Sequence, residues 1–198
     1  LNNLISRINS NFFLIISQIL FPSLMIMTWG IDNFGIWMFL ISVPYSISIL
    51  NVDLVTPITN KMSFYYNKNR NMELSNIYSN FLFIVLFNLI IFVLLISIIF
   101  FSFDFNLKIL NNLSSNQIKI SLIAIIFSFT FFLLNSIFLV KINYKGKSYI
   151  SNNIIIFFDV IIKIALVVSF FFSENFIILP LIFLNFNILK TFILYIYS

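Results

Sequence analysis

Long apolar runs separated by short polar joints constrain this chain more than any other feature of its sequence. Each run is close to the roughly 20 residues that a helix needs to cross a lipid bilayer. The predicted spans cover residues 12–29, 34–59, 77–103, 118–140, 152–172 and 176–196. Only 9% of the residues are charged and 61% are hydrophobic, whereas a soluble domain carries about 25% charged residues. The sequence therefore predicts an all-α, polytopic membrane bundle of six transmembrane helices.

The residue types that are missing exclude several kinds of chemistry. The chain has no Cys and no His, so disulfides, thiolate nucleophiles, His-ligated metals and Ser-His-Asp triads are excluded within it. We expect no catalytic site, no metal site and no cofactor. The net charge is +5, but the 11 basic residues are scattered between apolar spans. Membrane lipids, and not nucleic acid, are therefore the predicted surroundings.

The basic residues of the joints predict how the chain lies in the membrane. One side collects seven of them, namely Arg7, Lys61, Lys68, Arg70, Lys141, Lys145 and Lys147, and the other side has Lys108 and Lys119. Basic joints stay in the cytoplasm, so both ends of this chain are predicted to be cytoplasmic. The chain starts with Leu1 and stops at Ser198, directly after an apolar run, which indicates a segment of a longer protein.

The first two spans carry signals for bends and for the membrane interface. Pro22, Pro44 and Pro57 are expected to bend these helices, because neighbouring helices can satisfy the backbone that proline frees. Trp29 and Trp37 flank a predicted tight turn over residues 30–33. Indole rings prefer the interface, so we expect this turn at the level of the lipid headgroups.

Four ionisable residues lie inside predicted spans: Asp53, Asp159, Lys163 and Lys190. Such a group costs about 2.5–3.5 kcal/mol on insertion scales and usually faces the bundle interior or a water-filled cavity. Asp159 and Lys163 are four residues apart and share a helix face. They form either a polar site in a transport pathway, with Lys163 facing an anionic ligand, or a self-neutralised pair that fixes helix packing. Asp53 is a candidate for loop anchoring or ligand contact, and Lys190 is expected to extend to the cytoplasmic interface.

Three short motifs resemble a known family. The stretch GIDNFGIW contains Gly30, Phe34, Gly35 and Trp37 in the pattern of a turn between the first two helices, and NVDLVTPITNKMSFYYNKNRNME follows at the end of the second helix. The third stretch, FFLLNSIFLVKINYKGKSYISNNIIIFFDV, contains a small basic joint. Together they look like the N-terminal half of Wzx-type O-antigen flippases, which belong to the multidrug/oligosaccharidyl-lipid/polysaccharide exporter superfamily. Val55 departs from the family pattern, which has Gly after the Asp-Leu pair.

The resemblance implies a function and a larger assembly. The complete transporter would have about twelve helices in two six-helix lobes, of which this chain is the first. It would move undecaprenyl-pyrophosphate-linked oligosaccharide repeat units across the bacterial inner membrane by alternating access, for O-antigen, capsule or exopolysaccharide synthesis. The cavity of such proteins is typically cationic, which suits Lys163 beside Asp159 as substrate-binding residues. Asp53 and Asp159 would be the candidate residues for ion coupling.

Other functions remain open at this stage. A drug/cation antiporter of the same superfamily would line its cavity with acids and aromatics. A membrane-embedded polysaccharide-processing enzyme would need a catalytic His or a large outward loop with Arg, and this chain has no His. A structural membrane subunit is the fourth alternative. The sugar repeat unit, the coupling ion and the oligomeric state are not encoded in any motif of this sequence.

Overall fold

The computed structural model describes residues 2–102, 115–172 and 176–198, and for some helical stretches, such as 43–53, it describes the backbone alone. The helices are α1 (Asn2–Asn67), α2 (Asn71–Ser102), α3 (Ser115–Asn143), α4 (Ser148–Phe172) and α5 (Ile178–Tyr197), and no strand occurs in these ranges. Five stretches are long and apolar enough to cross a membrane: Gln18–Ser42, Asn71–Leu94, Gln117–Asn143, Ser148–Ser169 and Ile178–Tyr197. The chain is a multi-pass helical membrane protein, as the hydropathy pattern predicts.

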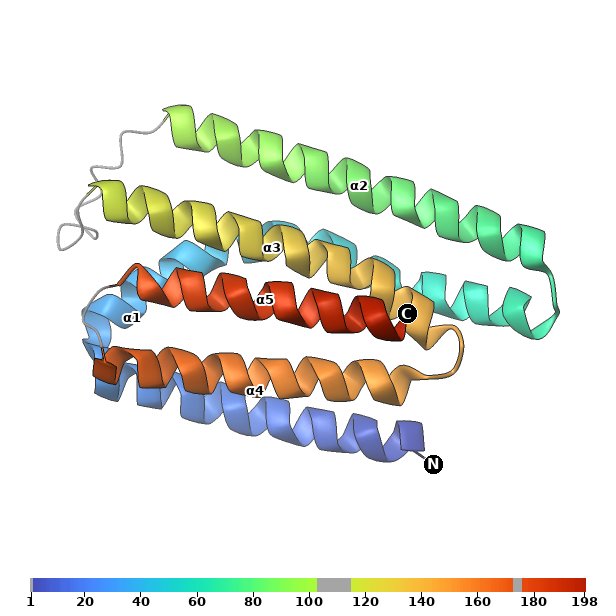
Figure 1. The fold of residues 1–198 in the computed structure, drawn as a ribbon, viewed down its shortest axis with the longest axis horizontal. Coiled ribbons are helices and arrows are strands. Elements are labelled where there is room, and N and C mark those ends of the chain that lie inside the picture. The colour runs from blue at the N-terminus through green and yellow to red at the C-terminus, as the bar shows by residue number, and fades with distance from the viewer. Residues whose placement is uncertain (1, 103–114, 173–175) are drawn as a thin grey trace.

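A break at Gly30 divides α1 into two legs. Gly30 has φ 78° and ψ 162°, a region of backbone space that is almost restricted to glycine. The legs 2–29 and 31–67 fold back beside each other (Figure 1), so the chain forms six helical segments that alternate in direction. The predicted turn over residues 30–33 is thus a single residue. Gly30 is the residue in α1 with non-helical φ/ψ, so the turn lies within its predicted range. The bends expected at Pro22, Pro44 and Pro57 stay predictions, because a proline bend can keep helical φ/ψ. The proline ring fixes φ close to the helical value.

The joints are shorter than the polar stretches of the sequence. The polar stretch 60–76 is helical up to Asn67 and again from Asn71. Residues with positive φ lie in both basic joints, Asn69 at 54° and Gly146 at 76°. Hydropathy marks the part of a helix that lipid covers, whereas the helix itself continues until the backbone turns. The helices therefore extend beyond the apolar runs at their polar ends.

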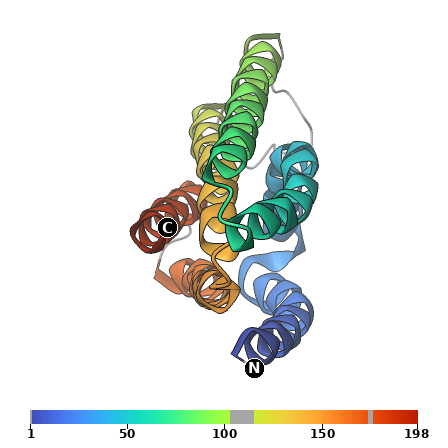
Figure 2. The ribbon, with the colours of Figure 1, turned by 90° about the vertical axis from the view of Figure 1, so that its right-hand side faces the viewer.

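Helix α3 lies at the centre of the bundle and packs most extensively against α5. Two ring contacts, Phe129–Phe183 at 6.2 Å and Phe138–Tyr195 at 5.6 Å, show that α3 and α5 run parallel and side by side. Small residues on α3, among them Ser121, Ala124 and Ser128, are buried, and such residues allow helices in a membrane to pack closely. Helix α2 contacts only α1 and α3 appreciably and lies at the edge of the bundle (Figure 2).

The two indoles beside the Gly30 break are buried inside the bundle. Trp29 is 4% exposed and Trp37 1%, with ring centroids 6.0 Å apart in an edge-to-face arrangement. Trp37 also meets Phe183 of α5 edge-to-face at 5.8 Å. The indole rings are thus covered by other helices, and the expected depth of the turn at the headgroups stays a prediction. Their rings join the two legs of α1 to α5, which buries more apolar area than an interfacial position would.

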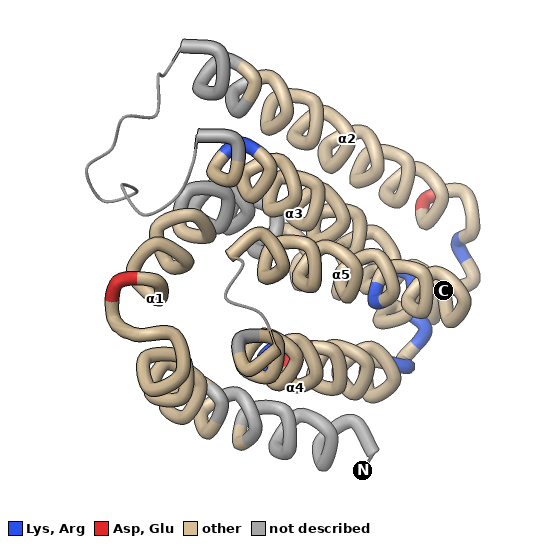
Figure 3. Tube along the Cα trace, turned by 60° about the vertical axis from the view of Figure 1, so that its left-hand side comes forward, with Lys and Arg blue, Asp and Glu red and all other residues tan. Residues whose placement is uncertain are grey.

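The basic joints lie together at one end of the molecule. Both termini of the described chain, the α1–α2 joint and the α3–α4 joint are at this end (Figure 1). Figure 3 shows the basic residues concentrated around these joints. The segregation of Lys and Arg that the sequence predicts is thus a feature of the folded bundle.

Candidate functional site

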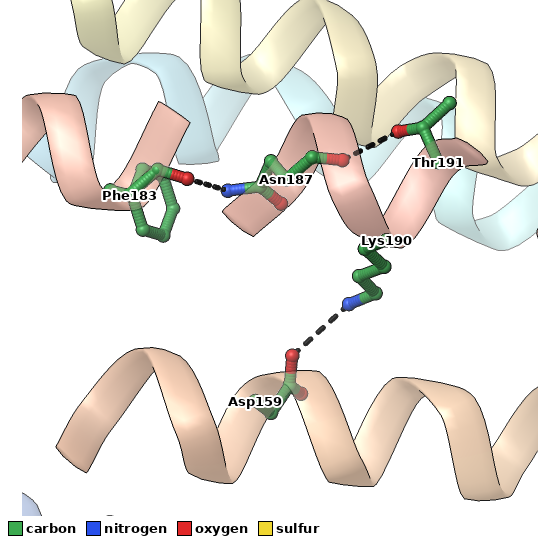
Figure 4. Close-up of polar contacts among 5 residues, drawn as sticks. All are labelled: Asp159, Phe183, Asn187, Lys190 and Thr191. Carbon is green, nitrogen blue, oxygen red and sulfur yellow. Dashed lines mark hydrogen bonds and ion pairs between the residues drawn. The ribbon is translucent and has the colours of Figure 1, made fainter. Parts of the chain in front are cut away.

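An ion pair joins α4 to α5 inside the membrane-spanning part of the bundle. Nζ of Lys190 lies 3.1 Å from Oδ1 of Asp159 (Figure 4). The Lys190 side chain is 7% exposed and the Asp159 side chain 33%. At this distance the ammonium donates a charge-assisted hydrogen bond to the carboxylate, which is about twice as strong as a neutral one. The two helices are therefore linked by a strong polar contact in apolar surroundings.

Lys190 belongs to a polar turn of α5 whose other members bond within their own helix. Nδ2 of Asn187 donates to the carbonyl oxygen of Phe183 at 2.8 Å, and Oγ1 of Thr191 donates to the carbonyl oxygen of Asn187 at 2.7 Å (Figure 4). Both side chains are buried. Because these two polar groups are satisfied locally, the Lys190 ammonium is the group of this turn that reaches another helix.

Lys163 lies one turn beyond Asp159 on α4 and extends toward α1. Its Nζ is 5.9 Å from the centroid of the Phe21 ring, within the range of a cation–π contact, and the residue is partly buried. Three ionisable residues thus lie in the seams that α4 makes with α1 and α5. Two are lysines and one is an aspartate, so this layer carries net positive charge when the lysines are protonated.

Asn135 of α3 adds an unsatisfied group near this layer. The two ring contacts between α3 and α5 place Asn135 level with Thr191. Asn135 is 2% exposed, and neither its Oδ1 nor its Nδ2 has a hydrogen-bond partner within the described chain. A buried amide without partners costs about 1–3 kcal/mol. Such a group is more easily explained at a site that takes up a polar ligand or water.

The structure changes the interpretation of the intramembrane charges. Lys190 is buried and paired with Asp159, so the expectation that it extends to the cytoplasmic interface is wrong. The Asp159 carboxylate pairs with the Lys190 ammonium across the helix seam, so Lys190 does not need to extend to the headgroups. Asp159 and Lys163 lie on one helix, as expected. The side chain of Asp53, the candidate for loop anchoring or ion coupling, lies outside the described residues.

A depth argument could have found the Asp159–Lys190 pair from the sequence. Asp159 lies 15 residues before Glu174, and Lys190 lies 15 residues after Asn175. In an antiparallel helix hairpin, residues equally distant from the turn lie at the same depth. This count gives the depth of the two residues but not the helix faces on which they lie, which only the structure shows.

No family model, no curated protein and no solved structure matches this chain. The described residues also hold no group of three His, Cys, Asp or Glu side chains that could bind a metal ion. Functional interpretation therefore depends on the charged and polar residues of the chain itself.

Proposed function

We propose that this chain is one lobe of a polysaccharide flippase, which moves undecaprenyl-pyrophosphate-linked oligosaccharides across the bacterial inner membrane. One observation carries the proposal: two lysines and one aspartate lie in the apolar seams of α4, and the carboxylate is already bonded to Lys190. The layer has an excess of positive charge that suits a pyrophosphate. The short motifs around Gly30, Asp53 and Lys145 support the same family.

In this proposal Lys163 is the residue that meets the anionic headgroup. It is partly buried on α4 and faces α1, the helix that is broken at Gly30. Charged side chains at such a depth are costly and usually face a cavity or a partner. A second six-helix lobe would supply the opposite wall of the pathway. The basic end of the bundle would face the cytoplasm, because basic joints are retained there.

Asp159 is the proposed ion-coupling group of the described chain. Its carboxylate holds the buried Lys190 ammonium. Protonation of Asp159 would remove this partner and weaken the link between α4 and α5. A proton could in this way bias the relative position of two helices, which is the requirement for coupling to alternating access. Asp53 remains the second candidate for this role.

A drug/cation antiporter is the alternative transport function. The aromatic cluster of Trp29, Trp37 and Phe183 would suit an organic cation. The sign of the charge argues for an anion, since Asp159 is bonded to Lys190 and Lys163 adds a further positive group. We propose a transporter and not an enzyme, because the seam charges suit binding and the chain lacks His and Cys.

The proposal is tested by neutralising Lys163. The full transporter is reconstituted into vesicles with a fluorescent undecaprenyl-pyrophosphate oligosaccharide, and the fraction that crosses the bilayer is followed with a membrane-impermeant quencher. We expect Lys163→Gln to lower the rate about tenfold or more, the value of one lost charge-assisted hydrogen bond. Lys163→Arg should retain most of the rate.

The matched control is Lys119→Gln, which removes one exposed positive charge at the opposite end of the bundle from the basic joints. It should transport at the wild-type rate. If Lys163→Gln also transports at the wild-type rate with equal protein per vesicle, Lys163 has no part in substrate binding. Uptake of an organic cation in place of the lipid-linked sugar would favour the antiporter.

A further inference from the structure

Three lysines crowd the joint between α3 and α4. Lys141 lies in the last turn of α3, and Lys145 and Lys147 flank Gly146 directly before α4 begins at Ser148. In the described part of the chain, the acidic residue close to the basic joints is Glu73, which pairs with Arg70 at 3.7 Å. The three lysines of this joint, called here the lysine joint, therefore have no carboxylate to balance them among the side chains that the structure describes.

The fold holds the lysine joint in a fixed position against two other helices. Nζ of Lys145 donates to the carbonyl oxygen of Ser198 at 2.7 Å, which ties the joint to the end of α5. Oγ of Ser63 donates to the carbonyl oxygen of Tyr144 at 3.2 Å, and the rings of Tyr66 and Tyr144 meet at 5.4 Å. These contacts tie the joint to α1. The lysines are thus presented on a rigid corner formed by α1, α3 and α5.

The crowding has an electrostatic consequence. Burial, and then the charges of Lys141 and Lys147, lower the pKa of Lys145 from its ordinary value. Charged groups of one sign held together are stabilised when an anion joins them. A bound anion is therefore expected to stabilise the lysine joint.

Tyrosines around the lysine joint indicate its depth in the membrane. Tyr65 and Tyr66 lie near the end of α1, Tyr144 in the joint, Tyr149 at the start of α4, and Tyr195 and Tyr197 at the end of α5. Tyrosine is enriched where a membrane protein passes through the headgroup layer. The lysines are therefore level with the phosphates of the surrounding lipid.

We propose that Lys141, Lys145 and Lys147 form a binding site for the headgroup phosphate of an anionic phospholipid. The phosphate lies at the corner of α1, α3 and α5, and the acyl chains lie along the apolar surface of the bundle. Juxtamembrane lysines attract anionic lipid in this way. The lipid, and not a soluble phosphate, is the occupant because the joint is level with the headgroups and adjoins the apolar spans. The site is separate from the α4–α5 layer and does not depend on what the protein transports.

The test compares lipid selectivity of the wild-type chain and of Lys141→Gln/Lys145→Gln/Lys147→Gln. Each protein is placed in phosphatidylcholine bilayers with a minor fraction of phosphatidylglycerol, and spin-labelled forms of the two lipids report which one is immobilised at the protein. The wild type should prefer phosphatidylglycerol, and each lysine removed should lower the preference about fivefold at low salt. Added salt should weaken the preference because it screens the charges.

Two further measurements keep the proposal falsifiable. Lys147→Gln and Lys119→Gln each remove one exposed positive charge. Only Lys147→Gln should reduce the preference for phosphatidylglycerol. These single variants also test the site if the triple variant misfolds. Equal loss in both variants would show that net charge alone selects the lipid and would overturn the site. Inorganic phosphate should not displace the labelled phosphatidylglycerol at matched ionic strength, and displacement would show that a soluble phosphate is the occupant.

Discussion

Two ion pairs in this molecule use the same chemistry in opposite surroundings. Lys190 and Asp159 meet at 3.1 Å across the α4–α5 seam, with the lysine side chain 7% exposed. Arg70 and Glu73 meet at 3.7 Å at the start of α2, with side chains 56% and 45% exposed. In the seam each charge is costly without the other, whereas at the surface water solvates both. Burial, more than distance, therefore decides which pair matters for the fold.

The largest effect is expected when the seam pair loses its carboxylate. Asp159→Leu leaves Lys190 buried without its acidic partner, and we expect the free energy of unfolding to fall by about 3–5 kcal/mol. Unfolding in mixed micelles with increasing sodium dodecyl sulfate, followed by circular dichroism, measures this change. Asp32→Leu, which removes an exposed acid beside Gly30, serves as the control and should have little effect. A loss below about 1 kcal/mol in Asp159→Leu would place this pair in the same class as the surface pair.

Removing both partners separates the cost of a broken pair from the value of the pair itself. In Asp159→Leu/Lys190→Met the seam contains apolar side chains of similar volume. Such replacements are often neutral or stabilising, so the double variant should regain at least about 2 kcal/mol of what Asp159→Leu loses. The same denaturation series gives the coupling between the sites. The comparison also needs the single variant Lys190→Met. If the losses of Asp159→Leu and Lys190→Met simply add in the double variant, the 3.1 Å contact does not stabilise the seam.

The smallest effect is expected at the surface pair. Glu73→Gln removes an exposed carboxylate from the first turn of α2 and should lower the free energy of unfolding by less than about 1 kcal/mol. Repeating the measurement at high salt should abolish most of this difference, because salt screens exposed charges. A salt-independent loss would mean that Glu73 acts through packing and not through charge.

The sequence predicted the number and order of the helical segments because apolar run length is a strong signal in lipid. It placed the helix ends poorly. Polar residues such as those of 60–67 remain helical past the apolar run, and only the backbone at Asn69 and Gly146 reveals where the chain turns. It did place the turn between the two legs of α1, since Gly30 lies in the predicted turn over residues 30–33.

The candidate site was predicted only in part. Asp159 and Lys163 were evident because ionisable residues are rare in apolar runs. The pairing of Asp159 with Lys190 depends on how α4 and α5 are rotated about their axes, and this rotation is set by packing against α1 and α3. Asn187 illustrates the same limit, since its amide donates to the carbonyl oxygen of Phe183 in its own helix, a choice of partner that the sequence does not reveal. Partner choice between helices is a property of the assembled bundle.

The parallel packing of α3 and α5 has a consequence for biosynthesis. These two helices share the most extensive contact in the bundle, yet α4 lies between them in the chain. The ribosome needs about 3–11 s at 5–20 residues per second to add the roughly 55 residues that follow Asn143. Until then the face of α3 that packs against α5 is without this partner. During that interval lipid or a membrane chaperone must occupy the face. The order of synthesis therefore makes α3 the helix most exposed to wrong partners before the bundle closes.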